Sequence, residues 1–149
     1  MCSLPEYPTV AVNLSVPFLS MIDVTTAACA PYESIGVLAT DGCIMSGEYQ
    51  RALNEIGVRA IVPGEKELAT IMQAIDSIKA GEMHEATVTK LAIVARALVD
   101  RGAQAVIAGC TEIPLVLSND AIPVPLIDST NELAKATVSK ALRPPQPQD

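Results

Sequence analysis

Short apolar runs rich in β-branched residues alternate along this chain with amphipathic patterns of helical period, and this alternation most restricts its fold. The runs at residues 34–39, 58–62, 105–108 and 124–127 are each typical of a buried strand, because they are short and almost continuously apolar. Strands that are separated by helices pair in parallel through right-handed crossovers. The sequence therefore predicts an α/β fold, with a parallel sheet of about four strands flanked by helices.

Four amphipathic helices are expected to cover this sheet. Apolar residues recur at steps of three and four over residues 49–56, 68–78 and 88–99. Ser46 is expected to cap the first of these helices, because its hydroxyl can accept a backbone N–H. Ser129 and Glu132 have the spacing of a capping box and predict a last helix that ends near Leu142.

The two ends of the chain have less regular patterns. Residues 16–19 fit a strand and residues 23–30 fit a short helix, but nothing upstream supplies a layer for them to pack on. The tail at residues 143–149 is polar and rich in proline, and we expect it to be disordered. Residues 34–142 are therefore expected to form the single folded lobe.

The composition excludes several classes of protein. Aromatic residues make up 3% of the chain, so its core is expected to consist of Ala, Val, Ile and Leu. The formal net charge of −7 argues against binding to nucleic acid or to an anionic membrane surface. No apolar run approaches the ~20 residues of a bilayer span, and the N-terminus lacks the pattern of a signal peptide. Four scattered cysteines without a CxxC pair argue against a zinc site or a disulfide framework, so a cytoplasmic location is expected.

Two polar segments follow predicted strands, and chemistry in parallel sheets sits at the carboxyl ends of strands. They are Thr40-Asp-Gly-Cys43, after the first strand, and Gly109-Cys-Thr-Glu112, after the third. Cys110 is the best single candidate, because a helix that began there would favour its thiolate through unpaired N–H groups and the helix dipole. The alternative is a buried cysteine that packs as a small apolar residue.

The neighbours of Cys110 also allow two interpretations. Thr111 offers a hydroxyl and N–H groups to a carboxylate, and Glu112 places an acid beside the thiol, but both residue types also suit the start of a helix. Thr40 can present a hydroxyl to an anion, although the following Asp-Gly is also a common turn. Cys43 is either a second thiol near Cys110 or a residue packed under the next helix. No GxGxxG or P-loop spacing appears, so no nucleotide cofactor is predicted.

Several segments, in the expected order, resemble the aspartate/glutamate racemase family. Gly109-Cys-Thr-Glu-Ile-Pro-Leu115 resembles the second cysteine motif of that family. The segment at residues 35–42, followed by Ser46-Gly-Glu-Tyr49, resembles the first strand and turn of the same lobe. Shorter matches stand at residues 61–63, 78–81 and 124–128.

The resemblance implies racemisation of an acidic amino acid, such as aspartate, without a cofactor or metal. In this mechanism one thiolate removes the α-proton and a second thiol returns a proton on the opposite face. Cys110 is the implied acid/base, and Glu112, where glutamate racemases carry histidine, points to the aspartate racemase branch. Thr40 and Thr111 would bind the α-carboxylate. Lys79 matches the lysine that is expected to hold the distal carboxylate.

The chain departs from the family at its beginning. Residues 7–23 resemble the end of a first lobe, so residues 1–33 are expected to be a remnant of that lobe. Cys2 stands near the position of the first catalytic cysteine, but Ser3-Leu4 replaces the Asn-Thr pair that follows it in the family. Cys43 stands where the family has a second threonine.

The second base is therefore expected from Cys2, from Cys43 or from a second copy of the chain in a homodimer. The alternative is a catalytically inactive protein that binds a small dicarboxylate or serves as a partner subunit. A third alternative keeps the fold and changes the reaction, because related enzymes decarboxylate or isomerise dicarboxylates with similar cysteines.

Overall fold

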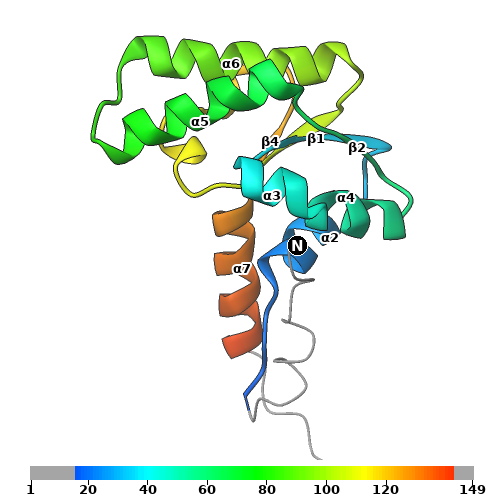
Figure 1. Cartoon of the computed structure of the whole chain (residues 1–149). Helices are drawn as coiled ribbons and strands as arrows, with labels where there is room; N and C mark the ends of the chain where they lie inside the picture. Colours follow the sequence, from blue (N-terminus) through cyan, green and yellow to red (C-terminus); the bar gives the residue numbers. More distant parts are fainter. Residues whose placement is uncertain (1–15, 143–149) are drawn as a thin grey trace, which may run out of the picture.

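The computed structural model describes residues 16–142. Cys2 and the proline-rich tail at residues 143–149 lie outside the described residues. One sheet of four parallel strands, in the order β2-β1-β3-β4, runs through the centre (Figure 1). The strands are β1 (Ser34–Leu38), β2 (Arg59–Ile61), β3 (Ala105–Ala108) and β4 (Leu126–Asp128). The prediction of an α/β fold with a parallel sheet of about four strands is confirmed.

Helices precede, connect and follow the strands. They are α2 (Met21–Ala28), α3 (Asp41–Ser46), α4 (Glu48–Glu55), α5 (Glu65–Lys79), α6 (Glu85–Asp100) and α7 (Ser129–Leu142). Two short 3₁₀ turns, η1 (Ile113–Leu115) and η2 (Asn119–Ala121), connect β3 to β4. None of the helices within residues 16–142 is long and apolar enough to cross a bilayer.

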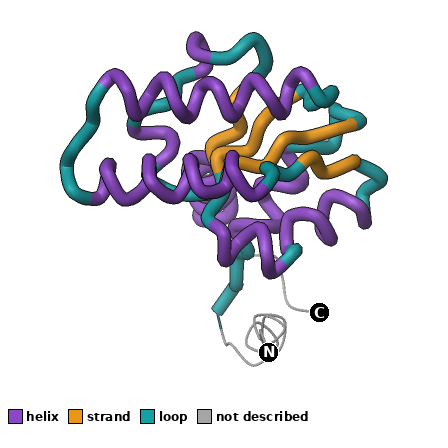
Figure 2. The backbone as a smooth tube through the Cα atoms, turned by 45° about the horizontal axis from the view of Figure 1, so that its top comes forward, coloured by secondary structure: helices purple, strands orange, loops and turns teal. Residues whose placement is uncertain are grey.

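The helices form a layer on each face of the sheet (Figure 2). Val106 and Ala108 of β3 belong to the apolar cluster that includes the buried residues of α5 and α6. Ala105 and Ile107 alternate with them and belong to the cluster that includes the buried residues of α4. Because successive side chains of a strand point to opposite faces, each central strand contributes to both cores. This explains why the strands are almost continuously apolar in sequence.

Gly36 in β1 sets how closely α6 approaches the sheet. A Cβ atom at this position would lie 3.0 Å from Cβ of Leu98, on α6, and 3.3 Å from Cβ of Ala103. Only a glycine leaves this space free, and the Leu98 side chain is completely buried against it. The central strand and its covering helix are therefore in closer contact than a larger residue would allow.

The helix that was expected after Ser46 is observed as α4, and the separate short helix α3 precedes it. Thr40 starts α3 early, because its hydroxyl accepts a hydrogen bond from the backbone N–H of Cys43. Gly47, with φ of 70°, ends α3 and also stands at the N-cap of α4. The expectation that Ser46 caps the helix is therefore wrong, and its hydroxyl donates instead to the carbonyl of Cys43.

The expected capping box at the start of α7 is also wrong. The Asp128 carboxylate accepts hydrogen bonds from the backbone N–H groups of Thr130 and Asn131, so Asp128 acts as the cap. Ser129 is the first helical residue, and its hydroxyl donates to the carbonyl of Ala108 at 2.8 Å. The side chain of Glu132 pairs with Lys135.

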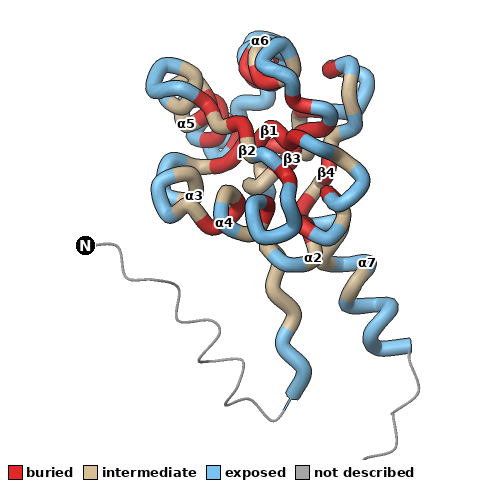
Figure 3. The backbone as a smooth tube through the Cα atoms, turned by 90° about the vertical axis from the view of Figure 1, so that its right-hand side faces the viewer, coloured by how far each residue is buried: buried red, intermediate tan, exposed pale blue. Residues whose placement is uncertain are grey.

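The start of the described chain adds a helix to one face of the sheet. Residues 16–20 do not form a strand, and α2 begins at Met21, with the Ser20 hydroxyl as its cap. This helix packs against α4 and α7. Figure 3 shows that buried residues gather on the strands, whereas most of α7 beyond Ser129 is exposed.

We predict that Gly36→Ala destabilises the protein by about 1–3 kcal/mol, the usual cost of overpacking a core. The midpoint of chemical or thermal unfolding measures this change. Gly42→Ala is the matched control, because no atom lies within 4 Å of a Cβ there and Ala suits a helix better than Gly. Equal stability of the Gly36→Ala variant and the parent chain would contradict the close approach of α6.

Candidate active site

Cys110 lies two residues after the end of the central strand β3, at the carboxyl edge of the sheet. Backbone contacts restrain the last residues before it: the N–H of Gly109 donates to the carbonyl of Leu38 at 2.7 Å. A Cβ atom on Gly109 would lie 3.1 Å from Cβ of Ala39, so the segments after β1 and β3 leave the sheet side by side. The topology thus brings Thr40, which follows Ala39, to the same edge as Cys110.

The Cys110 thiol is part of a compact cluster of polar groups. Its Sγ donates a hydrogen bond to Oε2 of Glu112 at 2.7 Å. The hydroxyl of Thr111 donates to the same carboxylate oxygen at 2.9 Å. Cys110 and Glu112 are both partly exposed, and Thr111 is exposed. One carboxylate oxygen therefore holds both a thiol and a hydroxyl at the surface of the sheet edge.

No α-helix begins at Cys110. The chain makes a turn over residues 110–112 and then the short 3₁₀ turn η1. The expectation that a helix dipole favours the thiolate is therefore wrong. The pKa of Cys110 is instead raised above its ordinary value of 9.0, by burial and by the side-chain hydrogen bond to Glu112.

The two partners of this hydrogen bond have opposite pKa shifts. The bonds from Cys110 and then from Thr111 lower the pKa of Glu112 below its ordinary value of 4.5, because they stabilise the carboxylate. At neutral pH the proton therefore rests on the sulfur, and the carboxylate is charged. The Cys110 thiol is thus a proton donor, and the Glu112 carboxylate beside it is a proton acceptor.

Lys79 is the last residue of α5, and its positive charge acts on this cluster. It lowers the pKa of both Cys110 and Glu112, although in each case it is a minor cause beside burial and hydrogen bonding. The side chain is exposed. The Lys79 ammonium group therefore acts on the Cys110 thiol through its charge. The same charge can attract an anion to this edge of the sheet.

The structure does not bring Cys43 together with Cys110. Cys43 packs against the apolar cluster that contains Tyr49 and Leu53 of α4. Its pKa is raised by burial and by the charge of Glu48, on the same side of the sheet. Thr40 reaches the site edge, and its hydroxyl caps α3. Within residues 16–142 the structure places no second thiol in contact with Cys110.

Two positioning contacts were not recognised in the sequence. Ser129 was expected to cap α7, but it holds the Ala108 carbonyl two residues before the thiol. Tyr49 was recognised only as part of an apolar helix face and of a matched segment, and its ring lies against Gly109. The signal that could have indicated such a contact is the glycine itself, since a glycine at a strand end can mark a close approach.

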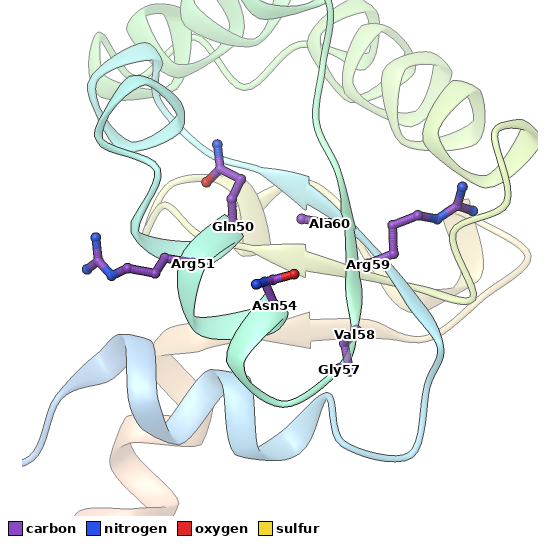
Figure 4. Close-up of a pocket in the computed structure, with 7 residues that line it drawn as sticks. All are labelled: Gln50, Arg51, Asn54, Gly57, Val58, Arg59 and Ala60. Atoms are coloured by element: carbon purple, nitrogen blue, oxygen red, sulfur yellow. The ribbon is translucent and has the colours of Figure 1, made fainter.

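One hollow of the described surface lies away from these residues. It has a volume of about 580 Å³ and lies between α4 and the edge strand β2 (Figure 4), lined by Gln50, Arg51, Asn54, Gly57, Val58, Arg59 and Ala60. None of these is a candidate site residue. No group of three His, Cys, Asp or Glu side chains within residues 16–142 is arranged to hold a metal ion.

Comparisons with known proteins agree with the fold. The family described as Asp/Glu/Hydantoin racemase matches residues 3–137. The "Broad specificity amino-acid racemase RacX" of Bacillus subtilis is 31% identical over 137 residues, which are 91% of this chain and 60% of that protein. The "Uncharacterized protein in pnlA 3'region" of Pectobacterium carotovorum is 32% identical over 124 residues, covering 80% of this chain and 82% of that protein.

Solved structures give the same result. A putative Asp/Glu racemase from Yersinia pestis superposes with a TM-score of 0.85 at 26% identity, over 92% of this chain and 61% of that one. The Picrophilus torridus aspartate racemase has a TM-score of 0.75 at 23% identity, over 89% of this chain and 56% of that one, which compares the fold alone. The chain thus spans about 60% of the length of the Bacillus and Yersinia proteins.

We predict that removal of the Glu112 charge and removal of the Lys79 charge shift the pKa of Cys110 in opposite directions. Glu112→Gln lowers the pKa, because it removes the negative charge that stabilises the protonated thiol, and Lys79→Met raises it. The pH dependence of alkylation of Cys110 by iodoacetamide, followed by peptide mass spectrometry, measures both. Shifts of the same sign in the two variants would contradict this electrostatic description.

Proposed function

The chain belongs to the Asp/Glu/Hydantoin racemase family, and from this premise we propose that it is an amino-acid racemase that acts on aspartate or a similar acidic amino acid without a cofactor. The observation that carries the proposal is the Cys110 thiol, hydrogen-bonded to Glu112 at the carboxyl end of β3. The similarity to the broad-specificity amino-acid racemase of Bacillus subtilis supports the reaction class.

Racemisation requires proton transfer on both faces of the α-carbon. A base removes the α-proton on one face, and an acid delivers a proton on the other, which inverts the configuration. Cys110 is suited to the delivering role, because its raised pKa keeps the thiol protonated at neutral pH. After delivery its thiolate carries the charge, and the enzyme is ready for the opposite direction.

Glu112 is proposed to assist this proton transfer. Its carboxylate accepts the thiol hydrogen bond and stays charged because its pKa is lowered. It can receive the proton of the Cys110 thiol, so that the resulting thiolate takes the α-proton. In the opposite direction the thiol gives its proton to the α-carbon, and the protonated Glu112 returns a proton to the thiolate. The Thr111 hydroxyl fixes the same oxygen and limits its rotation.

The substrate's two carboxylates are proposed to have separate partners. Thr40 and Thr111 stand on neighbouring segments at the sheet edge. Thr40 offers its hydroxyl to the α-carboxylate, and Thr111 offers its backbone N–H, because its hydroxyl donates to Glu112. Lys79 lies at the end of α5 and offers a positive charge to the distal carboxylate. An amino acid with a second carboxylate fits these partners better than a neutral amino acid, because its distal carboxylate can pair with the positive charge of Lys79.

The second base is proposed to come from Cys2 or from a second copy of the chain in a homodimer. Cys43 is less suited to be the second base, because it packs in the cluster on the α4 side of the sheet, whereas Cys110 packs against the cluster on the other side. The inactive alternative, a protein that binds a dicarboxylate without turnover, predicts binding but no exchange, so a single experiment separates the two.

We predict that the protein exchanges the α-proton of L-aspartate for deuterium in D₂O and forms D-aspartate. NMR of the α-proton and chiral chromatography of the same sample measure the two events. Cys110→Ser abolishes both, whereas the matched Cys43→Ser variant retains exchange. Retained exchange in the Cys110→Ser sample would indicate a contaminating racemase or another base.

The pattern of products identifies the number of bases. Exchange with inversion requires an acid or base on each face of the α-carbon. Exchange without inversion means that only one face is catalysed. Absence of exchange in a folded sample would overturn the racemase proposal, and a melting temperature raised by aspartate in that sample would favour the binding-only alternative.

We also predict that Lys79→Met raises KM for aspartate by roughly tenfold or more, the loss expected for a charge-assisted contact. Steady-state kinetics measure this change. Lys66→Met is the matched control, because Lys66 is an exposed lysine in the first turn of the same helix. Equal KM values in the two variants would remove Lys79 from the substrate site.

A further inference from the structure

Tyr49 is a fully buried aromatic residue with no assigned part in the reaction. It lies on α4 with 1% of its surface exposed and packs in the apolar cluster between this helix and the sheet. Burial raises the pKa of its hydroxyl, and the neighbouring hydroxyls of Thr25 and Ser129 partly offset this rise. The ring therefore extends from α4 so that its hydroxyl lies near Thr25, on α2, and near Ser129, which holds the Ala108 carbonyl.

The ring edge lies against the backbone directly before the catalytic thiol. A Cβ atom on Gly109 would be 3.0 Å from Cε2 of Tyr49, which is closer than nine in ten real Cβ contacts. The same atom would be 3.1 Å from Cβ of Ala39 and 3.3 Å from the carbonyl oxygen of Leu38. Gly109 is therefore enclosed by the ring on one side and by the chain after β1 on the other.

Hydrogen bonds restrain this segment at two points. The N–H of Gly109 donates to Leu38, and the carbonyl of Ala108 accepts from Ser129. The bonds hold one N–H and one C=O, whereas the Tyr49 ring blocks movement of the Gly109 α-carbon towards α4. Steric contact and hydrogen bonds together fix the direction in which the chain enters Cys110.

We propose that Tyr49 is a positioning residue for Cys110, and that its ring, by supporting Gly109, keeps the Cys110 thiol within hydrogen-bonding distance of Glu112. The ring contact performs this role and the hydroxyl does not. The catalytic meaning of the contact rests on the proposed racemase function, but the position of the thiol is measurable without any substrate.

Loss of the ring has a specific consequence for the thiol. The backbone at Gly109 gains freedom, the Cys110 side chain gains solvent contact, and its hydrogen bond to Glu112 weakens. Burial and that bond both raise the thiol pKa, and the charge of Lys79 lowers it. Since the two raising causes diminish together, the thiol titrates closer to its ordinary value.

The test compares Tyr49→Leu, which removes the ring, with Tyr49→Phe, which keeps it. The rate of iodoacetamide alkylation of Cys110 is followed against pH, and peptide mass spectrometry separates this residue from the other cysteines. We expect the Tyr49→Leu midpoint to fall by about half a pKa unit or more, equivalent to a roughly threefold change in the ionisation constant. We expect the Tyr49→Phe midpoint to match the parent chain.

Leu53→Ala is the control for general destabilisation. Leu53 is completely buried on the same helix and in the same cluster, and it is not among the atoms nearest to the Gly109 position. This variant is expected to lose about 2–5 kcal/mol of stability and to keep the parent midpoint. A midpoint that moves equally in Leu53→Ala, or in Tyr49→Phe, overturns the proposal.

An unchanged midpoint in a folded Tyr49→Leu variant also overturns it. If circular dichroism shows that this variant does not fold, Gly109→Ala disturbs the same contact from the other side and is expected to lower the midpoint too. An unchanged midpoint in the Gly109→Ala variant would likewise overturn the proposal. Because no substrate is used, failure of this test leaves the racemase proposal intact, and an inactive protein can still show the shift.

Discussion

Four residue pairs join β1 to β3 in parallel, from Ile35 with Ala105 to Leu38 with Ala108, and the rest of the lobe is arranged around this pairing. The N–H of Gly109 extends it by one further bond to Leu38. Because parallel strands end at the same edge, the pairing places the turn at Thr40 next to the turn at Cys110. A shift in register would separate them and turn the buried side chains to the wrong faces.

Small residues make this centre compact enough to hold a site. Gly36 admits Leu98 on one face of the sheet, and Gly109 admits Tyr49 on the other. A Cβ atom at either glycine would make contacts closer than nine in ten real ones, so the covering side chains pack tightly at these two points. Tyr49 thus packs on the segment that leads to Cys110, and Leu98 packs on the neighbouring strand β1 from the other face.

The electrostatics of the site differ from those of a thiolate activated by a helix. The raised pKa of Cys110 and the lowered pKa of Glu112 leave the proton on the sulfur in the free chain. For a reaction that both removes and returns protons, a thiol beside a charged acceptor is as useful as a thiolate, because each form is required in one of the two directions. The charge of Lys79 brings the opposite sign to the same edge without neutralising either group.

Periodicity in the sequence was sufficient for the strand order along the chain, the fold class and the edge at which polar residues gather, because buried strands and amphipathic helices require apolar residues at fixed spacings. It was not sufficient for the caps, since Ser46, Thr40, Ser129 and Asp128 are all residues that can cap and only the folded backbone decides which one does. The sign of the Cys110 pKa shift and the contact of Tyr49 with Gly109 were also decided by tertiary structure. Burial by residues distant in sequence is the largest cause of the raised pKa. Gly109 in the sequence can mark a close approach, but only the fold decides that Tyr49 makes it.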